Sequence, residues 1–158
     1  MSKRKKDYLI EINKLIDQEK YKDIETLVFK IIRNYEDSLL YYYLGLAQIM
    51  LNKEELGVDN LWRSISLDID LNLNYPRNLL ANIYIKRNNY SLAEKFLKES
   101  IQIDKCLSTY LTLIDVLIIL EKKDEANNFL EIVKIEFSDN IDLEGLISLE
   151  KEISSIGN

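Results

Sequence analysis

Three stretches of the chain repeat one another without internal gaps, and this repetition constrains the fold more than any other feature. In each stretch a small or apolar residue is followed 12 positions later by a small one: Gly45 and Gly57, Ala81 and Ala93, and Ile114 and Ala126. The second residues of these pairs, Gly57, Ala93 and Ala126, are 36 and 33 residues apart. In a weaker upstream copy, Ile24 precedes Gly57 by 33. A period in this range predicts stacked structural repeats.

Each copy holds two helix-period patterns separated by a short polar turn. The patterns predict helices at about 7–18, 21–34, 38–51, 54–68, 75–88, 91–104, 108–121 and 124–137, with a ninth at about 141–155. Only 4 Gly and 1 Pro occur among 158 residues, which disfavours a sandwich or barrel of many short strands. The sequence therefore predicts an all-α fold.

Several helix starts carry cap signals. Ser91 with Glu94 forms a capping-box pattern, and Asn52 with Glu55 is a looser version. Pro76 fits the first turn of the predicted helix at about 75–88, and Asn74 could cap that helix. Asp139 or Asn140 could cap the last helix.

These repeats resemble the tetratricopeptide repeat family, whose unit is a helical hairpin of about 34 residues with a diffuse signature. Residues that match the signature are Tyr41, Leu44, Gly45, Gly57, Leu61 and Ser64 in the second unit, Leu80, Ala81, Tyr84, Ala93, Leu97 and Ser100 in the third, and Tyr110, Leu113, Leu117, Ala126 and Leu130 in the fourth. The first unit is degenerate, the third has Arg77 where a large residue is usual, and the usual terminal Pro is absent.

The resemblance implies a right-handed α-solenoid of about four antiparallel helical hairpins with a C-terminal capping helix. The units are expected at about 5–37, 38–73, 74–106 and 107–139, with the last helix at about 141–155. Together they would form one domain over residues 1–158.

Catalytic and metal-binding chemistry lacks its usual residues. The chain has no His, so Ser-His and Cys-His nucleophile pairs and His-ligated metals are excluded. It has one Cys, and its four Gly are too scattered for a phosphate-binding loop. The acidic pairs Glu54/Glu55 and Asp124/Glu125 fall at helix starts, where negative charge is favourable. We expect no enzyme, no metal and no cofactor.

Charge and hydropathy limit the partners. The net charge is -6, although Lys3, Arg4, Lys5 and Lys6 are basic, so the body of the chain would repel nucleic acid. We expect the basic stretch to be a solvated, frayed terminus. The longest apolar run, residues 111–120, is too short to span a bilayer, and no secretory signal is apparent. We expect a cytoplasmic protein that does not insert into membranes.

In the tetratricopeptide family the first helix of each hairpin lines a concave groove. The residues that this implies here are Leu9 and Asn13, then Tyr42, Tyr43, Leu46, Ile49 and Met50, then Asn78, Asn82 and Lys86, and finally Thr112, Asp115 and Ile119. The second unit offers an apolar and aromatic patch, and the third a polar stripe at i, i+4 and i+8. Such a surface suits an extended peptide with an apolar segment, although a core role for Tyr42, Tyr43 and Leu46 is equally open.

The leading hypothesis is therefore a scaffold or adaptor that binds a peptide segment of another protein. A secretion or folding chaperone that shields an apolar client segment is the first alternative. The second is a structural subunit that self-associates, as a homodimer, through its apolar last helix. That helix carries Ile141, Leu143, Leu146, Ile147, Leu149, Ile153 and Ile156, which could instead pack on the fourth hairpin.

Overall fold

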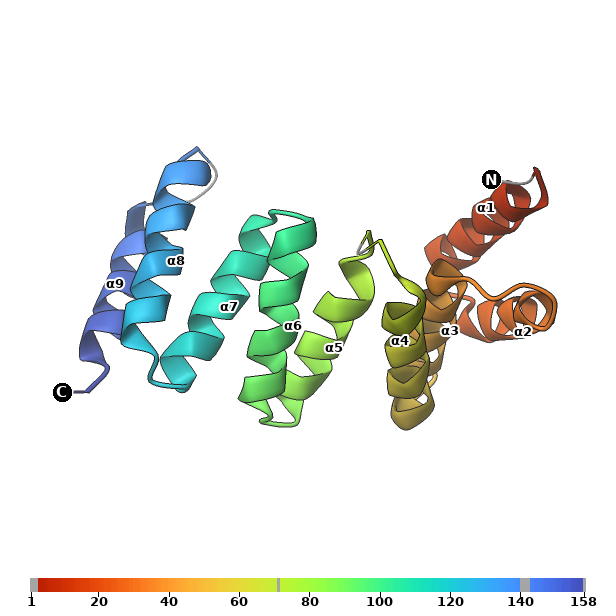
Figure 1. Cartoon of the computed structure of the whole chain (residues 1–158), viewed down its shortest axis with the longest axis horizontal. Helices are drawn as coiled ribbons and strands as arrows, with labels where there is room; N and C mark the ends of the chain where they lie inside the picture. The colour runs from red at the N-terminus through yellow and green to blue at the C-terminus, as the bar shows by residue number, and fades with distance from the viewer. Residues whose placement is uncertain (1–2, 71, 140–142, 158) are drawn as a thin grey trace. The chain divides into compact units, whose positions relative to one another are not determined.

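A computed structural model describes residues 3–70, 72–139 and 143–157, and over these ranges the chain forms nine α-helices and no strand (Figure 1). The helices are α1 Lys3–Asp17, α2 Tyr21–Ile32, α3 Ser38–Met50, α4 Glu54–Leu67, α5 Tyr75–Lys86, α6 Tyr90–Ile103, α7 Leu107–Ile119, α8 Lys123–Glu136 and α9 Leu143–Ser155. The all-α prediction is confirmed, with most boundaries within two residues. However, α1 begins four residues earlier than expected, so residues 3–6 are helical and not frayed.

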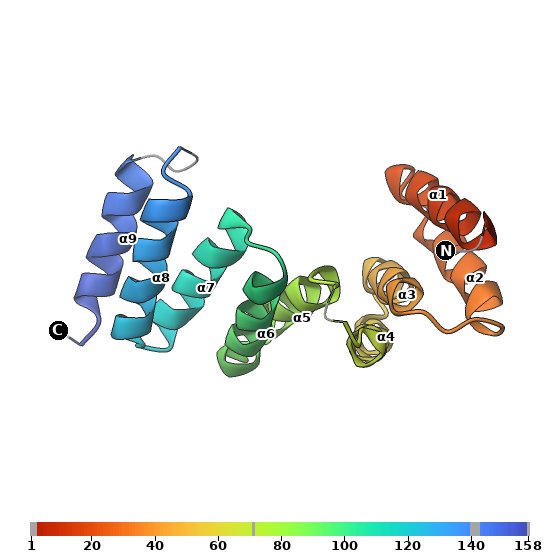
Figure 2. The same ribbon diagram turned by 45° about the horizontal axis from the view of Figure 1, so that its top comes forward.

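The chain divides into two compact units, Met1–Pro76 and Arg77–Asn158. The N-terminal unit holds α1 to α4 with the first residues of α5, and the C-terminal unit holds the rest of α5 with α6 to α9. Within each unit, helices that are consecutive in sequence pack against one another; α8 and α9, for example, lie side by side in both views (Figures 1 and 2). The organisation as one domain over residues 1–158 stays a prediction.

Four hairpin turns adopt the same backbone conformation. Glu19, Asn52, Asn88 and Glu121 have φ values of 54°, 59°, 56° and 57°, in the left-handed region. In the α3–α4 turn, Asn52 N donates to Ile49 O at 3.0 Å and Lys53 N donates to Gln48 O at 2.8 Å, and the other three turns repeat this pair of bonds. This is the Schellman ending of a helix. The four residues are spaced 33, 36 and 33 apart, which matches the period in the sequence.

The turn geometry corrects two predicted caps. Asn52 is the left-handed residue that follows α3, and Lys53, not Asn52, occupies the cap position of α4. Ser91 lies inside α6, whose cap is Asn89, with its side-chain oxygen accepting from Leu92 N at 3.3 Å. A further cap was not predicted from the sequence.

That missed cap is Asp37, which precedes α3. Its carboxylate accepts hydrogen bonds from Leu39 N at 3.1 Å and Leu40 N at 3.3 Å. Pro76 does lie in the first turn of α5, as predicted. Of the two residues predicted to cap α9, Asn140 lies outside the described residues, and a cap by Asp139 stays a prediction.

Each unit encloses its own apolar core. In the N-terminal unit, α1, α2 and α3 share a cluster of buried aliphatic side chains: Ile12, Ile24, Val28, Ile31, Leu40, Leu44 and Ala47. In the C-terminal unit the fully buried side chains include Leu80, Phe96, Leu113, Ile114, Leu117 and Leu130. Burying one such Leu or Ile contributes roughly 1.5–3 kcal/mol, so these clusters hold the hairpins together.

Arg77 occupies a core position although it is charged. Its side chain is only 2% exposed, and its Nε donates to Glu99 Oε2 at 3.3 Å. The aliphatic stem fills the place of the large residue expected in the repeat, while the guanidinium reaches a carboxylate of α6. The departure from the family signature is thus accommodated by an ion pair.

Gly45 and Gly57 allow α3 and α4 to approach very closely. A Cβ added to Gly57 would lie 2.5 Å from Ile49 Cγ1 and 2.9 Å from the backbone carbonyl oxygen of Gly45. A Cβ on Gly45 would lie 2.9 Å from Gly57 O. Because no side chain larger than hydrogen fits between the two backbones, this glycine pair sets the distance between the helices.

Candidate partner-binding surfaces

A polar cleft in the C-terminal unit brings together three of the predicted groove residues, Asn78, Asn82 and Thr112. Asn78 and Asn82 of α5 face Ser108, Thr109 and Thr112 of α7, and Leu97 of α6 contributes an apolar wall. The cleft has a volume of about 190 Å³. Asn78 and Asn82 lie one helical turn apart on α5, so their amides point to the same side of the helix.

Asn78 carries an unused hydrogen-bonding atom in this cleft. Its Oδ1 is buried and has no hydrogen-bond partner within the described part of the chain. A buried polar atom without a partner costs roughly 1–3 kcal/mol, so such an atom is usually satisfied by water or by a ligand. The cleft therefore offers an acceptor for a donor supplied from outside.

Two other predicted groove residues of this unit lie at the surface. Lys86, at the end of α5, and Asp115 of α7 are both exposed. Partial desolvation raises the pKa of the Asp115 carboxyl, and the negative charge of Glu152 on α9 raises it further. Neither Lys86 nor Asp115 lines the polar cleft, whose lining ends at Thr112 on α7.

In the N-terminal unit, two predicted groove tyrosines join a third in an aromatic cluster. The Tyr42 ring centroid lies 5.2 Å from that of Tyr43 and 5.7 Å from that of Tyr75, which begins α5. Tyr42 and Tyr43 are half-buried, whereas Tyr75 is 57% exposed. Burial, with smaller contributions from Tyr43 and Tyr75, raises the pKa of Tyr42 to about 12.

Tyr43 also ties α3 to the first hairpin. Its hydroxyl donates to Asn13 Oδ1 at 3.2 Å, and its ring packs against the core cluster of α1, α2 and α3. Asn13 is itself one of the groove residues implied by the family resemblance. These two residues are therefore brought together in space, and Tyr43 has both a packing contact and a solvent-facing edge.

The aliphatic residues predicted for the groove occupy mixed environments. Leu46 and Ile49 are half-buried, and Met50 is 50% exposed. Ile49 lies against Gly57 of α4, so much of its surface is used in packing the hairpin. A role for Leu46 and Ile49 in partner binding stays a prediction.

Buried carboxylates paired with lysines form a feature that the sequence analysis did not identify. Glu25 of α2 and Glu94 of α6 are almost fully buried. They directly follow Ile24 and Ala93, which occupy equivalent positions in the sequence repeat. Glu25 accepts from Lys53 and Lys22, and Glu94 accepts from Lys122 and Lys98. The signal in the sequence is a Glu followed 28 residues later by a Lys, found in both units.

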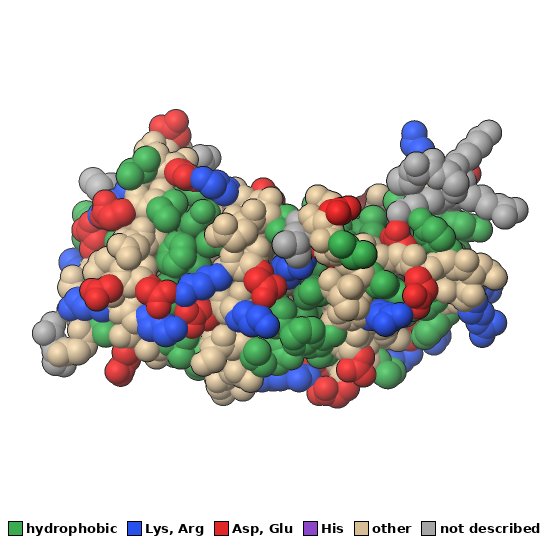
Figure 3. Space-filling view, in the orientation of Figure 1, with side chains coloured by type: hydrophobic (Ala, Val, Ile, Leu, Met, Phe, Trp, Pro, Cys, Tyr) green, Lys and Arg blue, Asp and Glu red, His purple; other side chains and the backbone are tan. Residues whose placement is uncertain are grey.

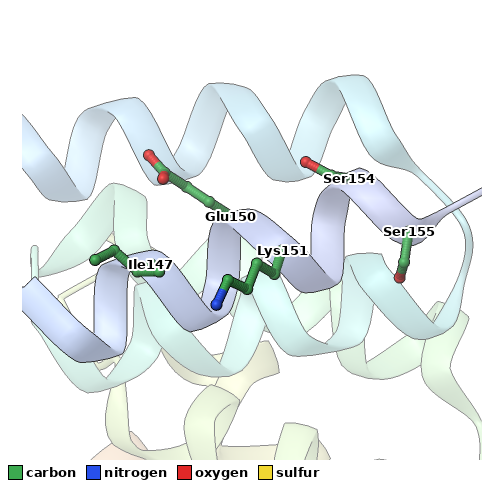
Figure 4. A pocket seen from close by; sticks show the side chains of 5 residues that line it. All are labelled: Ile147, Glu150, Lys151, Ser154 and Ser155. Atoms are coloured by element: carbon green, nitrogen blue, oxygen red, sulfur yellow. The ribbon is translucent and has the colours of Figure 1, made fainter.

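Helix α9 is fastened to α8 in the C-terminal unit. Ile153 is fully buried, Lys123 Nζ donates to Ser154 O at 3.1 Å and to Ile156 O at 3.2 Å, and Lys134 Nζ lies 2.6 Å from Glu150 Oε1. Figure 4 shows Glu150 pointing toward α8. These contacts support the capping role of α9, while Ile147 stays 40% exposed and a homodimer through this helix stays a prediction.

A depression along α9 is a weaker candidate. It is lined by Ile147, Glu150, Lys151, Ser154 and Ser155, all from this one helix (Figure 4). No second element closes over it, so it has the form of a surface between side chains. More generally, acidic, basic and apolar side chains are interspersed on the face seen in Figure 3.

Among the described residues, no helix has both the length and the apolar character needed to cross a bilayer. Over the same residues, no group of three or more Cys, Asp or Glu side chains is arranged to hold a metal ion.

Comparison with known proteins identifies a relative in fold. No protein-family model matches the chain, and no curated protein matches it. Among solved structures, the crystal structure of MamA protein is similar, with a TM-score of 0.69 and 19% sequence identity, covering 86% of this chain and 76% of that chain. This likeness shows the fold alone: the chain has an all-α helical-repeat solenoid fold. Membership of the tetratricopeptide family stays a prediction.

Proposed function

We propose that the protein is an interaction scaffold that binds an extended peptide segment of another protein along the first helices of its hairpins. The observation that carries this proposal is the polar cleft between α5 and α7, with its unpartnered Asn78 Oδ1. An extended peptide presents backbone N–H and C=O groups in alternation. Asn78 Oδ1 would accept from such an N–H, and the Asn82 amide would both donate and accept.

The side chains around these amides favour a peptide over a small charged metabolite. Ser108 and Thr112 are neutral donors and acceptors, and Leu97 gives the cleft an apolar wall. None of the residues lining the cleft carries a formal charge. In the N-terminal unit, the Tyr42–Tyr43–Tyr75 cluster supplies an aromatic surface for an apolar side chain of a partner.

Selection from a phage-displayed library of random peptides, with wild-type protein as bait, tests this function. Peptides that bind are titrated against Asn82→Ala and Thr112→Ala, and against Asn128→Ala as a control on the exposed face of α8. We expect the cleft variants to lose about tenfold in affinity, because each removes a hydrogen bond to the bound peptide, and the control to lose none. Equal binding by all variants would refute the groove assignment.

A further inference from the structure

A second cleft lies on the outer face of α2, on the second helix of its hairpin and away from the predicted groove residues. It has a volume of about 560 Å³ and is lined by Lys22, Glu25, Thr26, Phe29, Lys30, Arg33 and Lys53. All but Lys53 come from α2 and the residue that follows it. Lys53 comes from the α3–α4 turn, so two elements form the walls.

This face of α2 is not used for packing the hairpin. Ile24, Val28 and Ile31 of the same helix are buried in the core cluster, whereas Thr26 and Lys30 are exposed. Helical spacing places Lys22, Thr26, Phe29, Lys30 and Arg33 along the opposite stripe. Phe29 is 44% exposed in the middle of that stripe. The cleft thus combines an aromatic ring with cations on both sides of it.

The charges of the cleft are unbalanced. Four cations line it with a single carboxylate, Glu25, which is already satisfied by Lys22 at 2.9 Å and Lys53 at 2.8 Å. Lys30 and Arg33 have no carboxylate partner within the described ranges. This concentration of positive charge stands in a chain whose formal net charge is -6. Lys30 and Arg33 are therefore available to an anionic ligand.

We propose that the α2 cleft is a docking site for an acidic peptide segment that also carries an apolar side chain. The segment's carboxylates would pair with Lys30 and Arg33, and Arg33 can hold one of them through two N–H groups. Its apolar side chain would cover Phe29. A long polyanion such as nucleic acid fits the charges less well, because the rest of the chain is acidic and would repel its extended phosphate backbone.

Fluorescence anisotropy with a fluorescein-labelled peptide of repeated Glu-Glu-Leu triplets tests the proposal on the full chain. We expect saturable binding that weakens with added salt, and a loss of about tenfold or more in the Lys30→Glu/Arg33→Glu variant. Lys14→Glu/Lys20→Glu makes the same change of charge on exposed lysines outside the cleft and should lose much less. Circular dichroism checks that both double variants keep their helical content.

The aromatic contribution is tested separately. Phe29→Ala should weaken binding of the Glu-Glu-Leu peptide but leave a Glu-Glu-Ser peptide unchanged, since only the former has an apolar side chain to bury. The Asn82→Ala variant should bind both peptides like wild type, so failure here and failure of the proposed groove function are distinguishable. Absence of wild-type binding, equal losses in the two double variants, or displacement of the peptide by phosphatidylserine vesicles or by RNA would each overturn the proposal.

Discussion

Lys122 Nζ lies 2.8 Å from both carboxylate oxygens of Glu94, and it reaches them from the hairpin that follows. Lys53 holds the Glu25 carboxylate in the same way, at 2.8 and 2.9 Å. Each lysine comes directly after the left-handed residue of its turn, so the Schellman geometry aims its side chain back at the preceding hairpin. A turn conformation and an inter-hairpin ion pair are therefore coupled.

The first prediction concerns Lys122. Replacing it with Met keeps the aliphatic stem but leaves Glu94, which is 7% exposed, with Lys98 as its remaining cation. We expect the free energy of unfolding to fall by about 1–3 kcal/mol, the cost of a lost hydrogen bond to a buried charge. Urea unfolding followed by circular dichroism measures this. Lys86→Met, on an exposed lysine of the same unit, should change stability by less than about 0.5 kcal/mol.

The second prediction concerns pH. Burial raises the pKa of Glu94, but hydrogen bonds and charges from Lys122 and Lys98 outweigh burial, so its pKa lies below the ordinary value. A carboxyl with a lowered folded-state pKa stabilises the fold above its unfolded pKa of about 4.3, and this contribution is lost as the pH falls toward the folded-state value. The Glu94→Gln variant has an uncharged amide in place of this carboxyl, so its stability has no contribution from titration at this position.

Unfolding of wild type and Glu94→Gln should therefore be compared at several pH values. We expect wild type to be more stable near pH 7, and the difference to shrink steadily below about pH 4.3. A difference that stays constant down to about pH 2 would mean that the Glu94 carboxyl contributes through packing and not through its charge.

The third prediction concerns Gly57. An alanine Cβ there would meet the carbonyl oxygen of Gly45 at 2.9 Å, and a backbone atom cannot move aside as a side chain can. We expect Gly57→Ala to destabilise the protein by about 1–3 kcal/mol, although Ala is favoured over Gly in a helix by about 1 kcal/mol. Thermal unfolding provides the measurement. Ser66→Ala, on an exposed position of the same helix, should be neutral or slightly stabilising, and equal effects at both positions would contradict the close approach.

The fourth prediction concerns Glu121, a non-glycine residue at φ 57°. Glycine adopts this conformation without a steric penalty, so Glu121→Gly should stabilise the protein by up to about 1 kcal/mol. Introducing glycine within α8, as Asn127→Gly, should instead destabilise it. The midpoint of urea unfolding distinguishes the two directions. A loss of stability in both variants would show that the Glu121 side chain contributes more than the backbone strain costs.

Helix positions were well predicted because the apolar period and the repeat spacing reinforce each other in every copy. The caps were less predictable, because Asn52 and Asn88 adopt the left-handed turn conformation, whereas the neighbouring Asn89 caps α6 by its side chain. A capping-box pattern does not reveal which of two adjacent polar residues has left the helical conformation. That choice is made by the backbone hydrogen bonds of the turn.

The candidate surfaces were only partly predictable for a different reason. The positions taken from the family include Asn78 and Asn82, which the fold brings to one cleft. The same positions do not distinguish Tyr42, which contacts other tyrosines, from Ile49, which packs on Gly57. The α2 cleft was not identified, since Lys30 and Arg33 belong to a second helix and join Lys53 only through the fold. Surface charge clusters of this kind depend on tertiary neighbours.

The pairing of Glu25 with Lys53, and of Glu94 with Lys122, has a consequence for how such a chain can change in length. The equivalent positions at the middle of the chain hold Val58 and Asn89, a pair that carries no charge. Each acidic side chain therefore meets its cation inside one block of two hairpins. Loss of the hairpin that carries Lys53 or Lys122 would leave a buried carboxylate without its inter-hairpin cation, whereas loss of a whole block would remove both members of the pair.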